Sequence, residues 1–162
     1  MEKRRLRAVL VTLFAVIGMS VIAIPASADV TGEEGCTPGY WKNHTDNWLE
    51  DEEGNRSYET DDLFSDIFGV DHGDVTLLEA LDGGGGSGIA GAQEILARAA
   101  TAALLNSAHE GLGYPLRRDS ATAAGPAIFD AVQYVWDSGS RRKILKLARF
   151  LDELNNLGCP LN

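Results

Sequence analysis

Apolar residues recur at helical spacing through the second half of the chain. Residues 89–108 are rich in alanine and leucine and contain few residues that disfavour a helix, so we expect one long helix there. Its apolar face is formed by Ile95, Leu96, Ala99, Ala102 and Ala103, together with Asn106. The many alanines predict close contact with another helix.

Two more helices are predicted after this one. The first begins at Pro126, and its apolar positions are Ile128, Ala131, Val132 and Val135. A turn at residues 137–139 follows. Ser140 is the expected N-cap of the last helix and Gly158 its end, and its apolar stripe is formed by Ile144, Leu147, Ala148, Leu151 and Leu154. We expect the three helices of this half to form the main core.

The first half of the chain predicts shorter helices. A turn at Pro38-Gly39 precedes Tyr40 and Trp41, and Trp48 lies two helical turns further on, which predicts a short helix with an aromatic face. We expect these aromatic side chains to anchor the core, and a platform that stacks against carbohydrate is the alternative.

Two other short helices are expected before a run of glycines. The first carries the apolar stripe Leu63, Phe64, Ile67 and Phe68, and the second spans residues 75–81 with Asp74 as its N-cap. The glycines at 83–88 match the GxGxxG pattern, but no strand leads into them, so we interpret them as a connector. Because no segment alternates as a strand does, the sequence predicts an all-α fold, a small single-domain bundle of about six helices.

The chain opens with the three parts of a secretory signal peptide. Four basic residues at positions 3–7 precede an uncharged apolar run at 8–25, and Ala26-Ser27-Ala28 offers small residues to a signal peptidase. We therefore divide the chain into a signal peptide, residues 1–28, and a mature domain, residues 29–162, that is secreted or held at the cell surface. An uncleaved membrane anchor is the alternative, because the apolar run is just long enough to span a bilayer.

The mature domain is strongly acidic. The whole chain has a net charge of −10, and removing the leader's four basic residues and one acid leaves ten basic and 23 acidic residues, a net charge of −13. Thirteen of these acids lie in residues 46–82, where Arg56 is the only basic residue. Such a surface disfavours nucleic acid as a partner, because phosphate binding requires clustered lysine and arginine. Cations and basic proteins suit it better.

Two cysteines lie near opposite ends of the mature domain. An exported protein meets oxidising conditions, in which Cys36 and Cys159 are expected to form a disulfide that joins the N- and C-terminal ends. The chain-entropy model assigns about 4–5 kcal/mol to a loop of this length. A metal site and a catalytic thiol are the alternatives, but the pair lacks the C-x-x-C spacing of zinc sites.

Four short motifs punctuate the mature domain. The first, CTPGYWKNH, consists of Cys36, Thr37, Pro38, Gly39, Tyr40, Trp41, Lys42, Asn43 and His44. TLLEAL at 76–81, AALLNSAH at 102–109 and LNNLGCPL at 154–161 follow it. In this order the motifs resemble the signature of a group of small secreted proteins of bacteria, archaea and some fungi. The resemblance departs after His44, where those proteins often carry Pro-Glu and this chain has Thr45-Asp46. The group has no established activity, so the resemblance indicates a family and not a function.

The candidate metal ligands are histidines and acids. His44, His72 and His109 are the only histidines, and without an H-x-x-x-H pair we favour structural roles for the first and last. A calcium site using Asp61, Asp62, Asp71 and Asp74 is one interpretation of the acidic segment, and a solvated charged face is the commoner one. The loop at 49–60 fails as an EF-hand, because Leu49 and Thr60 stand where acids are required.

The last predicted helix carries a basic face. Arg141, Arg142 and Lys143 open it, and Lys146 and Arg149 continue the face from Arg142. Positive charge at a helix N-terminus opposes the helix dipole, so we expect a compensating partner. The chain's own acidic segment is the simplest one, and the acidic segment of a neighbouring copy, which implies self-association, is the alternative.

These patterns favour a non-catalytic structural or binding module over an enzyme. No Ser-His-Asp or Cys-His set stands out. We expect the acidic face to bind cations or an extracellular protein, and membrane contact only through an uncleaved signal segment. The alternative is a secreted hydrolase that uses a carboxylate and a histidine near His44.

Overall fold

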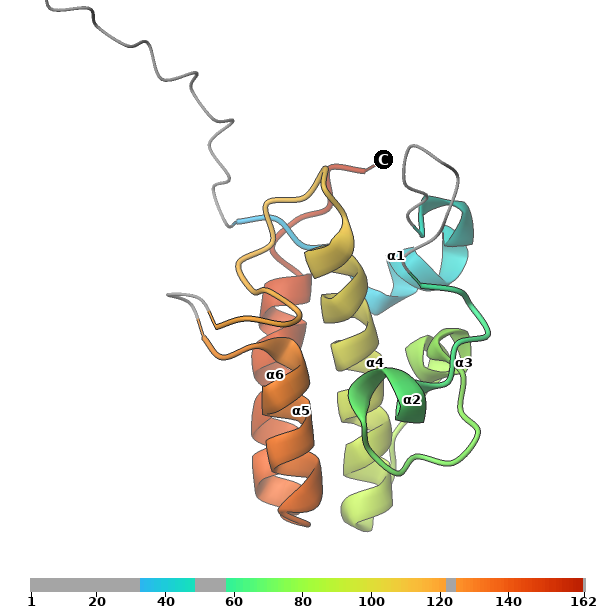
Figure 1. Ribbon diagram of the computed structural model, residues 1–162, viewed down its shortest axis with the longest axis vertical. Coiled ribbons are helices and arrows are strands. Elements are labelled where there is room, and N and C mark those ends of the chain that lie inside the picture. Colours follow the sequence, from blue (N-terminus) through green and yellow to red (C-terminus); the bar gives the residue numbers. More distant parts are fainter. Residues whose placement is uncertain (1–32, 49–57, 122–124, 162) are drawn as a thin grey trace, which may run out of the picture.

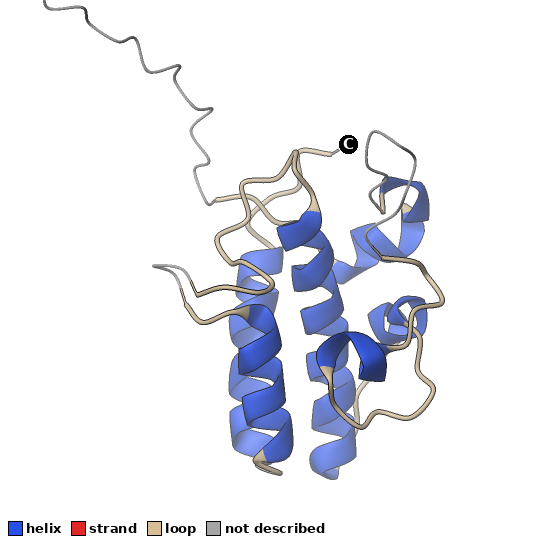
Figure 2. Cartoon of the chain, in the orientation of Figure 1, coloured by secondary structure: helices blue, strands red, loops and turns tan. Residues whose placement is uncertain are grey.

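The computed structural model describes residues 33–48, 58–121 and 125–161. The predicted signal peptide and most of the loop at 49–60 lie outside these ranges. The described residues form helices and no strands (Figure 2). The elements are α1 (Pro38–Asn43), a 3-10 helix η1 (Thr45–Asn47), α2 (Phe64–Phe68), α3 (Leu77–Asp82), α4 (Gly88–Ala108), α5 (Ile128–Asp137) and α6 (Arg141–Asn155). The prediction of a small all-α domain with about six helices is confirmed.

The long helix α4 is the centre of the fold. Helices α5 and α6 run beside it on one side, and α1, α2 and α3 lie toward its other side (Figure 1). Twelve of its 21 residues are buried, and six of these are alanines. Because alanine ends at Cβ, α6 packs closely on α4 through Ile144, Ala148 and Leu151. The predicted packing of α6 on α4 is therefore confirmed, and the core extends to residues of α1, α2 and α3.

Helix α2 and the loop after it are tied to α5. The rings of Phe64 and Phe68 stack with their centroids 4.3 Å apart, and Trp136 lies 5.6 Å from Phe64. Gln133 donates a hydrogen bond from Nε2 to the Phe68 carbonyl (2.9 Å), and Trp136 donates one from Nε1 to the Asp71 carbonyl (3.1 Å). These contacts hold α2 and the loop after it against α5.

Helix α3 begins differently from its prediction. Its N-cap is Thr76, and Asp74 does not cap it. The Thr76 hydroxyl accepts a hydrogen bond from the Glu79 N–H (3.2 Å), while the Glu79 carboxylate accepts one from the Thr76 N–H (2.9 Å). This capping box satisfies two backbone donors at once. The carboxylate accepts hydrogen bonds from the Thr76 N–H and from the Thr76 hydroxyl (3.1 Å), and these two bonds lower the pKa of Glu79.

The predicted bounds of the last two helices also shift. Helix α5 starts at Ile128, two residues after Pro126, and its first N–H group donates to the Arg117 carbonyl (3.0 Å). Helix α6 ends at Asn155, three residues before Gly158. Ser140 is the N-cap residue of α6, but its side chain makes no capping hydrogen bond.

The glycine run is packed against the start of α4. A Cβ on Gly91 would lie 2.2 Å from the backbone of Gly86, so the two segments approach too closely for any side chain. This contact supports the interpretation of the run as a connector. In the described part of the chain, no helix has the length and apolar character needed to cross a membrane.

Candidate functional site at the signature motif

The predicted disulfide is present. Cys36 and Cys159 are bonded across a sequence separation of 123 residues. Beside the bond, Gly35 and Gly158 donate backbone hydrogen bonds to each other's carbonyls (2.9 and 3.3 Å). A Cβ on Gly35 would lie 2.1 Å from the Leu154 carbonyl oxygen, so glycine lets this strand-like segment touch α6. The two ends of the domain are thus held side by side.

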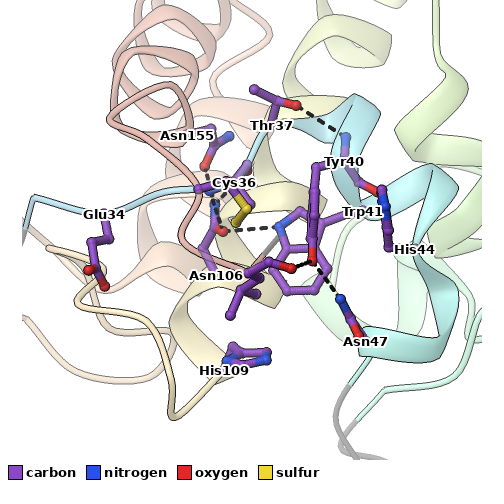
Figure 3. The surroundings of a disulfide bond; sticks show 12 residues. Glu34, Cys36, Thr37, Tyr40, Trp41, His44, Asn47, Asn106, His109 and Asn155 are labelled. Carbon is purple, nitrogen blue, oxygen red and sulfur yellow. Dashed lines mark hydrogen bonds between the residues drawn. A yellow bond between two sulfur atoms is a disulfide. The ribbon is translucent and has the colours of Figure 1, made fainter.

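A fully buried asparagine of α4 forms hydrogen bonds with the first residues of the domain. The Asn106 side chain accepts hydrogen bonds on Oδ1 from the Cys36 N–H (2.8 Å) and from Trp41 Nε1 (3.0 Å). Its Nδ2 donates to the Cys36 carbonyl (2.9 Å) and to Asn155 Oδ1 (3.0 Å). Figure 3 shows this side chain beside the disulfide, between the first segment of the domain and α6.

A second buried asparagine, Asn155 of α6, completes the network. Its Oδ1 also accepts a hydrogen bond from the Tyr114 hydroxyl (2.8 Å), and its Nδ2 donates to the Ala99 carbonyl (2.9 Å). Burial raises the pKa of Tyr114, which keeps the hydroxyl protonated as a donor. Every polar atom of both asparagine side chains therefore has a partner, the condition under which a buried polar network stabilises a fold.

Three of the four sequence motifs meet in this network. CTPGYWKNH supplies Cys36 and Trp41, AALLNSAH supplies Asn106, and LNNLGCPL supplies Asn155 and Cys159. We call these five residues the clasp. The motifs are far apart in the sequence. In the clasp, their polar and sulfur-containing residues together connect the first segment of the domain to α4 and to the C-terminal segment.

The aromatic residues of the first motif are also used inside the fold. Tyr40, Trp41 and Trp48 are only 9, 1 and 0 % exposed, which rules them out as a carbohydrate-stacking platform and confirms their predicted core role. The Tyr40 hydroxyl donates to the Leu161 carbonyl (2.9 Å), and Trp48 Nε1 donates to the Trp41 carbonyl (3.0 Å).

Thr37 and Pro38 shape the start of α1. Thr37 is the N-cap, and its hydroxyl accepts a hydrogen bond from the Tyr40 N–H (3.1 Å). Pro38 occupies the first helical position, where its missing N–H removes no helical bond. The Thr37-Pro38 pair therefore has a local structural explanation as the start of α1.

The exposed residues of the first motif have partners as well. Lys42 forms an ion pair with Asp82 of α3, and Asn43 donates from Nδ2 to the Gly39 carbonyl (2.7 Å). Both line an open groove of about 440 Å³, together with Arg98, Asp152 and Asn156. This groove is polar and holds both signs of charge, but His44 is not among the residues that line it.

His44 lies at the end of α1, and its ring contacts a residue of that helix. Its ring stacks on the Tyr40 ring at 4.3 Å, and its Nδ1 lies 2.9 Å from the Tyr40 carbonyl. A carbonyl oxygen only accepts, so Nδ1 carries the proton in this contact. The nitrogen that a catalytic carboxylate would orient is therefore occupied by a backbone group.

The other two histidines are packed against aromatic rings. His72 lies edge-on to Phe64 (5.4 Å) and Trp136 (5.0 Å), and His109 lies 6.0 Å from Trp41. Burial lowers the pKa of His72, against opposing effects of Glu94 and Asp71. Burial also lowers the pKa of His109, against Glu110, and its Nδ1 accepts from the Gly111 N–H (3.0 Å).

The four aspartates considered for calcium are used separately. Asp61 is exposed, Asp62 accepts a hydrogen bond from the Glu59 N–H (2.8 Å), and Asp71 accepts one from the Gly73 N–H (3.4 Å). Asp74 lines a different groove. Within the described ranges, no three histidine, cysteine, aspartate or glutamate side chains come together as metal ligands.

The basic face of α6 points away from the core. Arg142, Lys146 and Arg149 are exposed, and between described residues the only ion pair is the one formed by Lys42 and Asp82. The expected compensation by the chain's own acidic segment is therefore not seen in the described residues, while residues 49–57 of that segment lie outside them.

Comparison of the chain with models of protein families, with curated proteins and with solved structures finds no match in any of the three. The resemblance of its motifs to small secreted proteins stays a prediction. Any inference about function therefore depends on the clasp, the groove at Lys42 and the charged surfaces of this chain.

Proposed function

We propose that the chain is a secreted or cell-surface module that acts by binding and not by catalysis. The observation that carries the proposal is the use of the signature inside the fold. Its cysteine and tryptophan belong to the clasp, its threonine caps α1 and its tyrosine bonds the C-terminal segment. These structural roles account for the residues of the motif without invoking catalysis.

The geometry at His44 gives little support to a hydrolase. A histidine base needs a free nitrogen directed at the nucleophile and a group that orients the other nitrogen. Among the described residues His44 has the second contact only, to a carbonyl of its own helix, and its ring face is covered by Tyr40. The groove beside α1 is lined by Lys42 and Asp82, which neutralise each other.

The charged surface supports a binding role. Residues 57–97 hold nine acids and no lysine or arginine, and most of the acids in the described part are exposed. A one-signed surface of this kind concentrates cations and steers basic partners toward it. We infer that the α2–α3 side binds a positively charged region of an extracellular protein.

The catalytic alternative can be tested with matched variants. The full chain is expressed with its own leader in a secretory host, purified, and assayed on chromogenic esters, glycosides and peptides. We expect no turnover that depends on His44 or Lys42. Turnover that is lost in His44→Ala, but kept in Asp46→Ala at an exposed neighbouring position, would overturn the proposal if both variants melt at the wild-type temperature.

The binding role has its own assay. A basic protein such as hen lysozyme serves as the probe, and its affinity is measured at rising salt concentration. Neutralising Asp66 and Asp74 to asparagine is expected to weaken binding several-fold more than neutralising Asp119 and Asp137, which are exposed elsewhere. Equal effects of the two pairs would show that the α2–α3 side has no special role.

A further inference from the structure

Half of the basic residues of the mature domain are gathered on α6. Five of its ten lysines and arginines lie between positions 141 and 149. Arg142, Lys146 and Arg149 follow one another at i+4 and i+3 spacing, which puts them in one row along the helix. At a rise of about 1.5 Å per residue the row is about 10 Å long. We call these three residues the basic row.

The basic row lies opposite the buried face of α6. The core contacts of the helix are made by Ile144, Ala148 and Leu151, and the row falls on the other side of the helical wheel. Leu145 and Phe150 flank it as half-buried apolar residues, and Glu153 follows one turn after Arg149. The row is thus the outer surface of the α4–α6 layer.

Among the described residues, no ion pair neutralises the basic row. No acidic residue occupies the first turn of α6, where Arg142 stands against the positive end of the helix dipole. Its two nearest basic neighbours are engaged, since Arg141 donates to the Gly88 carbonyl (3.0 Å) and Lys143 lies over the Tyr134 ring (4.9 Å). Within the described residues, the basic row itself has no acidic partner.

A groove of opposite charge lies toward the other side of α4. It has a volume of about 620 Å³, and its charged walls are Asp74, Glu79 and Glu94, with His72 beside them. These residues come from the α2–α3 loop, α3 and α4, whereas the basic row belongs to α6 (Figure 1). No lysine or arginine lines the groove among the described residues. We call it the acidic groove.

We propose that the basic row of one copy docks into the acidic groove of a second copy. The proposal rests on the function above and names the basic partner as the chain itself. Three cations on the exposed face of α6 meet three carboxylates that line the acidic groove. The two surfaces belong to different parts of the fold, so one copy can use both at once, and the contact is heterologous and runs head to tail.

Charge also argues against the other pairings. A two-fold dimer through the row, or through the groove, would bring like charges together, which is unfavourable. The chain's net charge of −10 makes copies repel at long range. At about 0.1 M salt the screening length is about 10 Å, so distant repulsion is reduced while contacts inside the groove persist. Association is therefore expected at moderate salt and is lost near 1 M.

Sedimentation velocity of the purified full chain tests the contact. At about 0.1 M salt, where charges within about 10 Å still interact, the mean mass of the wild type is expected to rise above the monomer as protein concentration increases. Arg149→Glu should return it to the monomer. Arg117→Glu makes the same change at an exposed site outside α6 and should leave the mass unchanged.

Reciprocal charge reversal identifies the two surfaces as partners. One variant carries Lys146→Glu and Arg149→Glu, and the other carries Asp74→Lys and Glu94→Lys; Glu79 is kept because it caps α3. Each variant alone is expected to be monomeric. An equimolar mixture should associate, because a row from one variant and a groove from the other carry mainly opposite charges in both combinations, although both variants remain negatively charged overall.

Three outcomes would overturn the proposal. The wild type could stay monomeric at all protein and salt concentrations, or Arg117→Glu could act like Arg149→Glu, or the mixture could fail to associate. Polyphosphate is a further probe: binding that the Lys146→Glu, Arg149→Glu variant loses, with a monomeric wild type, would assign the row to a polyanion. None of these results changes the hydrolase assay, so failure of the contact is distinguishable from failure of the proposed function.

Discussion

Replacing Asn106 by leucine tests the clasp at its centre. Leucine has the same number of side-chain heavy atoms as asparagine and the same branch point at Cγ, so the main loss is four hydrogen bonds. The Cys36 N–H, the Cys36 carbonyl and Trp41 Nε1 are then left buried without this partner, while Asn155 keeps its bond from Tyr114. Each unpaired buried group costs about 1–3 kcal/mol. We expect a loss of about 4 kcal/mol in the free energy of unfolding, after the gain from burying leucine.

Chemical denaturation with the disulfide intact measures this loss. The midpoint in guanidinium chloride should fall with an unchanged slope, as for a change in stability alone. Ser107→Ala is the control, because Ser107 is the next residue and bonds only the local Leu104 carbonyl (2.8 Å). Its cost should be within about 0.5 kcal/mol. If Asn106→Leu were as mild as Ser107→Ala, the network could not be what holds the motifs together.

Three further predictions concern stability. Replacing Cys36 and Cys159 by alanine opens a loop with a sequence separation of 123 residues and should cost about 5 kcal/mol by the chain-entropy model; a change below about 1 kcal/mol in denaturant unfolding would contradict that role. Thr101 is fully buried, and its hydroxyl has no hydrogen-bond partner in the described structure, so Thr101→Val should stabilise the domain by up to about 1 kcal/mol, and a lower melting temperature would count against it. Burial lowers the pKa of His72 and His109, so the unfolded chain takes up protons first and stability should fall as pH drops below about 6.5. The melting temperature between pH 7.5 and 5.5 should depend less on pH in the variant His72→Gln, His109→Gln, and an identical pH dependence would refute this explanation.

Periodicity predicted most of the helices. The alanine-rich face of α4 and the stripe of α6 that contains Ile144, Ala148 and Leu151 are long, regular signals, and the helices follow them closely. The ends were less predictable, because they depend on competing partners. Thr76 outcompetes Asp74 as the cap of α3, since only Thr76 has Glu79 three residues further on.

The clasp was only partly visible in the sequence. The pairing of Cys36 with Cys159 follows from compartment and count, but the hydrogen bonds do not. The available signal was the position of two asparagines, since Asn106 and Asn155 each continue the apolar face of their helix. A buried face with one amide indicates that a partner exists, and only the fold shows that the two amides are each other's partners.

The separation of charge also depended on the fold. The sequence shows an acidic segment and a basic helix, and intramolecular pairing was the simpler expectation. Packing of α6 on α4 directs Ile144 inward and therefore turns Lys146 outward. Asp74 and Glu79 come together on another part of the molecule, so the predicted pairing is not found among the described residues.

The clasp exists as a unit only if its two asparagines depend on each other. A double-mutant cycle measures this directly: Asn106→Ala, Asn155→Ala and the double variant are compared with wild type in denaturant unfolding. Because Asn106 Nδ2 donates to Asn155 Oδ1 at 3.0 Å, we expect a coupling energy of about 1–3 kcal/mol. If the losses of unfolding free energy in the two single variants simply add, with a coupling energy within about 0.3 kcal/mol of zero, the claim that the motifs act together in one network is contradicted.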